Sequence, residues 1–110
     1  MEKFVKGDVL VIEYPYSDLK TYKRRPVLII KVPKGDDIIA VQITSSSYEE
    51  SVEIPLSNND FKHGNLNRES FIRIDKISSI EKSLIKYKLG SLKQEKFNYI
   101  LDKICLFLRN

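Results

Sequence analysis

The sequence has little cysteine, histidine or tryptophan: its 110 residues contain one cysteine, one histidine and no tryptophan. A single cysteine, Cys105, excludes an internal disulfide, so we expect a reducing, cytoplasmic location. Because a catalytic cysteine needs a histidine beside it, we interpret Cys105 as a packing residue. The one histidine, His63, lies in a polar stretch between Lys62 and Gly64 and is interpreted as a solvated loop residue. Chemistry that depends on a pair of histidines is excluded.

Long apolar runs and clusters of metal ligands are also missing. No apolar stretch approaches the roughly 18 residues that a membrane helix requires. The opening Met1-Glu2-Lys3-Phe4 has no apolar stretch of signal-peptide length. No group of His, Asp and Glu has the spacing of a metal site. We therefore expect a protein that contacts no membrane and uses no metal and no cofactor.

The composition is typical of a folded domain. Hydrophobic residues make up 42% and charged residues 31% of the chain, which is too apolar for a disordered protein. The length suits one domain, which we place over residues 1–110. Lysine and arginine number 19 against 15 acidic residues, a formal net charge of +4. This excess agrees with a polyanionic partner without requiring one, because many basic domains bind no nucleic acid.

Short apolar runs separated by turn residues occupy the first two-thirds of the chain. Residues 9–14 form a β-rich run that Pro15 stops, and residues 26–32 are apolar except for Lys31, as expected of a strand buried on both faces. Pro33-Lys34-Gly35-Asp36 has the composition of a turn, so the next run should return as a hairpin. A helical turn is expected over residues 79–82. The pattern predicts strands over residues 9–14, 26–32, 38–44, 51–54, 71–80 and 84–89.

The C-terminal segment changes its period. Its apolar residues fall at helical spacing and form one stripe, made of Phe97, Ile100, Leu101, Ile104 and Leu108. Ser91 with Gln94 three residues later is a capping-box pattern, and Gly90 should end the preceding strand. The stripe should pack in the core or at a subunit contact, and Phe107, off the stripe, could serve that contact. The fold class is mainly β with a C-terminal α-helix, about five to seven short strands in a strongly bent sheet or small barrel.

Three segments occur in a characteristic order. The first runs from Gly7-Asp8-Val9-Leu10-Val11 through a polar loop to Arg25-Pro26-Val27-Leu28, the second is Val41-Gln42-Ile43-Thr44-Ser45, and the third begins at Ser70-Phe71-Ile72-Arg73-Ile74-Asp75 and continues to Leu92. Together they cover most of the chain, and the chain resembles the MazF/PemK toxins. The resemblance implies an SH3-like barrel, a homodimer, sequence-selective cleavage of single-stranded RNA without a metal, and neutralisation by a cognate antitoxin.

Cleavage of RNA without a metal needs a group to take the proton of the 2′-hydroxyl, a group to protonate the leaving oxygen, and a cation for the charge that builds on phosphorus. Arg25 is the best candidate for the cation, because a guanidinium matches phosphate oxygens in a bidentate way and stays charged. The resemblance implies that Arg25 is catalytic; the alternative is an edge arginine paired with an acid such as Asp18. The resemblance also gives Thr44 a contact to the scissile phosphate, an assignment that Ser45 shares; the alternative is that Thr44 satisfies a turn.

Arg73 and Asp75 stand two residues apart, so they share one face of a strand with Phe71 and Ile77. Burial would raise the pKa of Asp75 and Arg73 would lower it, which could leave Asp75 a proton acceptor. Some PemK-type members use this arginine and aspartate as acid and base, with help from a histidine in the first loop, which this chain lacks. The alternative is a structural ion pair that orients the strand, and the sequence leaves both open.

Tyrosines alternate with cations around the first loop, from Tyr14 onward. Aromatic rings interleaved with positive charge suit stacked bases above a held RNA backbone. Tyrosines beside strands are also common in small β domains that bind nothing. The residues that we expect to bind RNA are Tyr16, Lys20, Tyr22, Lys23, Arg24 and Ser45.

Two other functions compete with RNA cleavage. A CcdB-like poison of DNA gyrase relies on a C-terminal segment with tryptophan, which this chain lacks, since it ends Leu106-Phe107-Leu108-Arg109-Asn110. A non-catalytic SH3-like binding protein, or a toxin that has lost activity, would keep the fold without the chemistry. The sequence ranks the nuclease first, with single-stranded RNA and a cognate antitoxin as partners.

Overall fold

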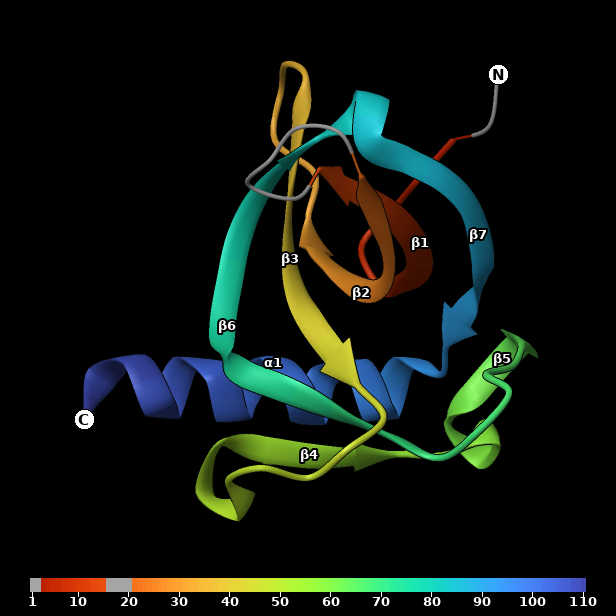
Figure 1. The fold of residues 1–110 in the computed structure, drawn as a ribbon. Coiled ribbons are helices and arrows are strands. Elements are labelled where there is room, and N and C mark those ends of the chain that lie inside the picture. The colour runs from red at the N-terminus through yellow and green to blue at the C-terminus, as the bar shows by residue number, and fades with distance from the viewer. Residues whose placement is uncertain (1–2, 16–20) are drawn as a thin grey trace.

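The computed structural model describes residues 3–15 and 21–110, which form a strongly curled sheet with one helix across one end of it (Figure 1). In chain order the strands and the helix are β1 (Asp8–Pro15), β2 (Tyr22–Lys31), β3 (Asp37–Thr44), β4 (Glu53–Leu56), β5 (Phe61–Gly64), β6 (Ser70–Glu81), β7 (Ile85–Leu92) and α1 (Gln94–Arg109). Short 3-10 turns stand at η1 (Glu50–Val52), η2 (Asn58–Asp60) and η3 (Lys82–Leu84).

The strands that the structure describes pair antiparallel in one seven-stranded sheet, in the order β4-β6-β3-β2-β1-β7-β5. This order places the β1-β2-β3 meander at the centre and leaves β4 and β5 at the two edges. Figure 1 shows the sheet curling on itself into a half-barrel. The expected fold class, mainly β with a C-terminal helix, is therefore confirmed, as is the hairpin between β2 and β3.

The curl buries both faces of the central strands. On one face, Leu10 of β1 and Ile29 of β2 belong to a cluster enclosed by the curl. On the other face, Val9 and Leu28 belong to a larger cluster that includes the buried side of α1. Alternate residues of one strand therefore enter two different cores, which explains why residues 26–30 are apolar without interruption.

The start of α1 differs from the prediction. The helix begins at Gln94 with Lys93 as its N-cap residue, and Ser91 belongs to β7. The Ser91 hydroxyl donates to Oδ1 of the buried Asp8 at 2.7 Å, so it does not cap the helix. Gly90 does not end the strand either, because β7 continues through it to Leu92. A Cβ atom at Gly90 would collide with the carbonyl oxygen of His63, so glycine lets β5 approach β7.

Smaller predictions also need correction. The helical turn lies at residues 82–84, because β6 stays paired with β3 as far as Glu81, opposite Asp37. His63 is exposed as expected but lies on β5 and not in a loop. Cys105 is exposed on α1, so its interpretation as a packing residue is wrong. Leu108 is 64% exposed at the free end of the helix, whereas Phe97, Ile100 and Ile104 are buried.

An irregularity in β6 shapes the region where the candidate residues meet. Between Val41 and Gln42 of β3, the partner on β6 changes from Ile77 to Arg73, so residues 74–76 have no partner on β3. Such a bulge bends the strand that carries it and re-aims its side chains. As a result, Arg73 lies opposite Gln42 on one side and opposite Glu53 of β4 on the other.

Candidate functional site

A cationic open groove of about 480 Å³ lies at the start of β2 and the end of β3. Its walls come from β2, the loop after β3, the loop before β6, and β7. Four of its lining residues are cations: Lys23, Arg24, Arg25 and Arg68. None of its lining residues is Asp or Glu, so the groove presents positive charge to any ligand. The remaining lining residues are Val11, Pro26, Ile43, Thr44, Ser45, Ser46, Tyr48, Leu66, Asn67, Ser70, Tyr87 and Leu89.

Arg25 lies on β2 opposite Ile12 of β1 and is half-buried. Within residues 3–15 and 21–110 its guanidinium makes no ion pair or side-chain hydrogen bond; the alternative partner, Asp18, lies outside the described residues. Burial raises the pKa of the Tyr14 hydroxyl, and the charge of Arg25 is among the influences that lower it, which places the guanidinium near Tyr14. Arg25 therefore offers the groove a half-buried cation that has no ion-pair partner among the described residues.

The neighbouring Arg24 is in a different state. Its Nε donates to the Glu13 carboxylate at 3.3 Å, and Lys86 approaches the same oxygen at 3.9 Å. Arg24 is well exposed, so solvent screens this pair and the bond is weak. Arg24 lines the groove with part of its charge already matched.

Thr44 ends β3, and its hydroxyl closes a tight turn. It donates to the Ser46 carbonyl and accepts from the Ser46 N–H, both at 3.3 Å. This is the local turn that the sequence offered as an alternative to phosphate contact. Thr44 nevertheless lines the groove beside Arg25, and Ser45 lines it next to Thr44, so the structure brings all three together.

A second hollow of about 290 Å³ adjoins the groove. It shares Arg25, Thr44 and Tyr48 with the groove, so these three residues stand on the border between the two spaces. Its lining residues are Arg25, Gln42, Thr44, Tyr48, Arg73 and Lys76, again without a carboxylate.

Arg73 and Asp75 form a bidentate pair, with Arg73 Nε at 2.9 Å from Oδ1 and Nη2 at 2.8 Å from Oδ2 of Asp75. The hydrogen bonds from Arg73 lower the pKa of Asp75, and burial opposes this without reversing it. The pKa of Arg73 is raised, first by the hydrogen bonds to Asp75. A carboxylate held in this way is a weaker proton acceptor than a free one, which favours the structural interpretation of the pair.

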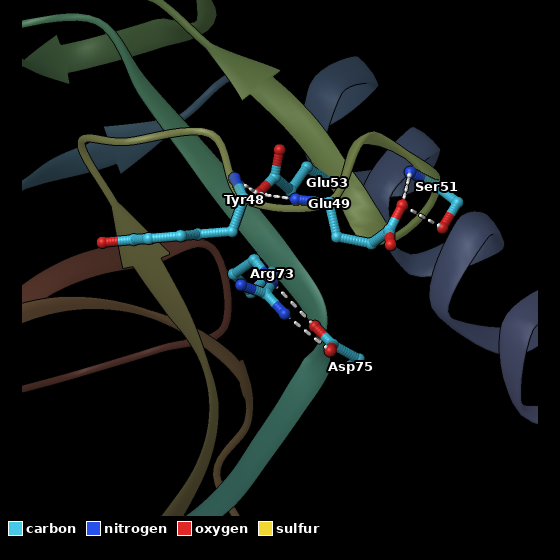
Figure 2. A network of polar contacts seen from close by, with 6 residues as sticks. All are labelled: Tyr48, Glu49, Ser51, Glu53, Arg73 and Asp75. Carbon is cyan, nitrogen blue, oxygen red and sulfur yellow. Dashed lines mark hydrogen bonds and ion pairs between the residues drawn. The ribbon is translucent and has the colours of Figure 1, made fainter.

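Glu53 fixes the loop that follows β3, as Figure 2 shows. Its carboxylate accepts from the Ser47 hydroxyl at 2.6 Å and from the backbone N–H groups of Tyr48 at 2.7 Å and Glu49 at 3.1 Å. These bonds lower the pKa of Glu53, the Ser47 bond most, and the charge of Arg73 acts in the same direction. The loop that carries Tyr48 is therefore tied to the strand beside Arg73.

The other predicted RNA-binding residues have mixed outcomes. Lys23, Arg24 and Ser45 line the groove, whereas Tyr22 is exposed on β2 without lining it. Tyr16 and Lys20 lie outside the described residues.

Sequence reasoning missed several residues of the site, namely Gln42, Tyr48, Asn67, Arg68, Lys76 and Tyr87. A tyrosine among serines and acids was a usable signal for Tyr48. The Asn67-Arg68 pair was treated only as part of a polar interruption. Its place in the groove depends on how β5 and β6 are arranged, which the local sequence does not reveal.

Within the described ranges, no group of three or more His, Cys, Asp and Glu residues is arranged to hold a metal ion. The described part of the chain also has no helix with the length and hydropathy to span a membrane. The independence from metals stays a prediction that only an assay can test.

Comparisons with known proteins agree on a family and a fold. The model of the family "PemK-like, MazF-like toxin of type II toxin-antitoxin system" matches residues 5–108. No curated protein sequence matches the chain. Among solved structures, an endoribonuclease from a mycobacterial species is 17% identical with a TM-score of 0.74, covering 98% of this chain and 93% of its own.

Two further solved structures have the same fold. An endoribonuclease in complex with its cognate antitoxin, also mycobacterial, is 16% identical with a TM-score of 0.71, covering 96% of this chain and 95% of that one. The Mycobacterium tuberculosis toxin MazF-mt6 is 21% identical with a TM-score of 0.68, covering 88% and 91%. At these identities the structures establish the fold and leave residue roles to the geometry of the site.

Proposed function

Since the chain belongs to the PemK-like, MazF-like toxins of type II toxin–antitoxin systems, we propose that it is an endoribonuclease that cleaves single-stranded RNA without a metal. The observation that carries this proposal is the groove itself: four cations line it, no carboxylate of the described residues does, and Arg25, at its border with the second hollow, has no ion-pair partner within those residues. A phosphate backbone is the ligand that such a surface attracts most strongly. The solved structures of similar fold that are named endoribonucleases support the same chemistry.

The reaction begins when the 2′-hydroxyl of one ribose attacks the adjacent phosphorus. The bond from phosphorus to the 5′-oxygen breaks, the hydroxyl proton leaves to a base, and the leaving oxygen gains a proton. Negative charge builds on the two non-bridging oxygens in between, where the Arg25 guanidinium can meet both at once. The products are a 2′,3′-cyclic phosphate and a 5′-hydroxyl.

The reaction also requires a general base that takes the proton of the 2′-hydroxyl. No Asp, Glu or His is among the described residues that line the groove or the second hollow, so electrostatic stabilisation by Arg25 has to supply most of the rate enhancement. Asp75 remains the carboxylate to test, although Arg73 holds it in its charged form. We propose that Thr44, whose hydroxyl donates to the Ser46 carbonyl in the free protein, donates instead to the phosphate when RNA binds.

A cleavage assay on a mixed-sequence RNA, followed by end mapping, tests the proposal. We expect activity to survive excess EDTA and to leave a 2′,3′-cyclic phosphate on the upstream fragment. A substrate with 2′-deoxyribose immediately upstream of the mapped cut should resist cleavage, because the nucleophile is missing. An enzyme that EDTA silences, or that cuts the deoxy substrate, would contradict this mechanism.

The alternative functions find less support. A gyrase poison or a non-catalytic SH3-like binding protein would not need a carboxylate-free groove bordered by an arginine that has no partner among the described residues. The family match also favours neither of them. Purified protein that binds RNA without cutting it would restore the second alternative.

We infer two protein partners. One is a second copy of this chain, since α1 leaves Leu106, Phe107 and Leu108 exposed at its end and an isolated domain gains nothing from that surface. The other is a cognate antitoxin with an acidic, partly disordered segment, whose carboxylates would occupy the cationic groove. A monomer in sedimentation at about tens of micromolar, or a neutralising partner that leaves RNA binding intact, would contradict these inferences.

A further inference from the structure

Tyr48 is an exposed aromatic residue at a place where exposure needs a reason. Its side chain is 74% accessible, although it stands on the border between the groove and the second hollow. A ring in that position adds nothing to the core of the domain. It does present a flat apolar face beside a cationic surface, which is the combination that stacks the bases of single-stranded nucleic acids.

The backbone that carries this ring is held in place before any ligand arrives. The Tyr48 N–H donates to Glu53 at 2.7 Å, and the same carboxylate binds the residues on both sides of Tyr48, Ser47 and Glu49. Figure 2 shows the Tyr48 side chain extending away from this clamp, so its ring stays free while its backbone is fixed. A surface that is ordered in advance loses less conformational entropy on binding.

The second hollow has the size and the polar groups for one base. Its volume of about 290 Å³ is near the lower end of small-ligand sites. Gln42 lines it and, within the described part of the chain, has no hydrogen-bond partner for its amide. An amide offers a donor and an acceptor side by side, which is the pattern that the edges of bases recognise. Lys76 supplies a further charge for a phosphate at the same hollow.

We propose that the second hollow is a nucleobase subsite, in which Tyr48 stacks on the base of a nucleotide next to the scissile phosphate and Gln42 reads the edge of that base. The hollow shares Arg25 and Thr44 with the groove, so a phosphate held there has its neighbouring nucleotide within reach of Tyr48. Glu53 is a positioning residue for this site. The proposal rests on the proposed function, because the subsite is defined relative to the phosphate that the protein cuts.

The test is a double-mutant cycle that combines removal of the Tyr48 ring with removal of a base from the RNA. After the cut made by wild-type protein has been mapped, abasic ribonucleotides are placed one at a time around it, and kcat/KM is measured for wild type, Tyr48→Ala and Tyr48→Phe. We expect Tyr48→Ala to lower kcat/KM about tenfold to a hundredfold, mainly through KM, and Tyr48→Phe to retain most activity. At one position beside the cut, the abasic substitution should lower kcat/KM of wild type by a similar factor. The same substitution should not lower kcat/KM of Tyr48→Ala any further.

Tyr99→Ala is the matched control, because Tyr99 is an exposed tyrosine on α1 that lines neither hollow. Its effect should be small and independent of every abasic substitution. Two results would overturn the stacking proposal. One is that the effects of Tyr48→Ala and of the abasic substitution on kcat/KM are additive at every position, and the other is that Tyr48→Ala has the kcat/KM of wild type. If wild-type protein cuts no RNA, the proposed function itself fails and the subsite fails with it, which is a different outcome from a nuclease indifferent to Tyr48.

The role of Gln42 is tested by changing the base at the position that the cycle identifies. Wild type should prefer one base by about tenfold or more, the scale of a paired amide–base contact. Gln42→Ala should reduce this preference. Tyr48→Ala should instead lower kcat/KM by a similar factor for substrates with each of the four bases, since stacking is tolerant of sequence. An unchanged preference in Gln42→Ala would show that Gln42 does not read the base.

Discussion

Two arginines border the same hollow and are used in opposite ways. Arg73 is held by Asp75 through two bonds of 2.8 and 2.9 Å, and it lies beside Glu53, which ties down the neighbouring loop. Arg25 has no such partner within the described ranges, although it lines the same space. A committed arginine fixes the shape of the site, and an uncommitted one supplies charge to a ligand. Position in the hollow alone would not distinguish the two.

The difference arises from the neighbours of each arginine. Residues two apart on a strand share a face, and for Arg25 these are Lys23 and Val27, neither of which is acidic. For Arg73, one of them is Asp75, and β4 adds Glu53 directly opposite. The bulge in β6 keeps Arg73 opposite Gln42 while residues 74–76 bend away, so the pair forms where the strand turns.

The largest effect that we predict comes from removing the uncommitted arginine. Arg25→Ala should reduce kcat by at least about two orders of magnitude, the scale for losing a preorganised group that stabilises developing charge. Arg25→Lys should recover little, because an ammonium cannot copy the bidentate fork. The unfolding midpoint should stay near that of wild type, since no ion pair of the described chain is lost. Cleavage rates and thermal unfolding of the same preparations measure both.

A matched control for Arg25 is Arg109→Ala, which removes an exposed arginine from the last turn of α1, outside both hollows. It should leave kcat unchanged. If Arg25→Ala cuts RNA as fast as this control, the assignment of transition-state stabilisation to Arg25 is wrong, even though the family membership would stand.

The committed pair should show the reverse behaviour. Asp75→Asn should lower the unfolding midpoint by a few degrees, because Arg73 loses its charged partner, and should leave kcat close to wild type. Asp102→Asn on the exposed side of α1 is the control, because it removes a carboxylate that has no ion-pair partner among the described residues. A collapse of kcat in Asp75→Asn without a change in folding would instead identify Asp75 as the general base and overturn the contrast between the two arginines.

Much of the fold could be predicted because its signals are local. The continuous apolar run before Lys31 predicted a strand buried on both faces, and that is how β2 sits between two cores. The period of the last segment predicted α1. The predicted capping box at Ser91 and Gln94 was wrong, because a serine three residues before a glutamine is only a local pattern. The Ser91 hydroxyl instead donates to Asp8, which lies 83 positions earlier in the chain.

The candidate site was only partly predictable for the same reason. Arg25 and Thr44 stood out because each lies where an apolar strand meets a polar loop. Their meeting with Tyr48 and Arg68 depends on strand pairing that one sequence does not specify. The three hydrogen bonds that Glu53 accepts could not be predicted, because no sequence pattern marks an acidic residue of a short strand as the acceptor for three donors of a neighbouring loop.

A smaller effect should appear in the pH dependence of stability. The pKa of Glu53 lies below its ordinary value of 4.5 and that of Asp75 below 3.8, so the unfolded chain binds these protons more readily. Their contribution to stability is therefore complete above about pH 4.5 and is lost as the pH falls through the folded-state values. The free energy of unfolding, measured with urea between pH 7 and pH 3, should decline as the pH falls. This decline should be shallower in the double variant Glu53→Gln/Asp75→Asn. An equally steep decline in that double variant would mean that other carboxylates carry the effect. The change is modest, because water screens both groups.

The smallest predicted effect concerns the salt dependence of RNA binding, and it extends the comparison to two further arginines of the groove. Arg68 is exposed and, within the described part of the chain, has no ion pair, whereas Arg24 is already bound to Glu13 at 3.3 Å. Each phosphate of a single strand that a cation neutralises contributes about −0.7 to the slope of log K against log salt concentration. Binding is measured with an RNA that carries 2′-deoxyribose immediately upstream of the cut and is therefore not cleaved. In this assay Arg68→Ala should reduce the magnitude of the slope by about 0.7. Arg24→Ala should reduce it by less, because Glu13 already matches part of its charge, and Arg109→Ala should not change it. Equal reductions for Arg24 and Arg68 would show that commitment to a carboxylate at this exposed surface does not withhold a cation from RNA, and would confine the contrast to Arg25 and the more enclosed Arg73.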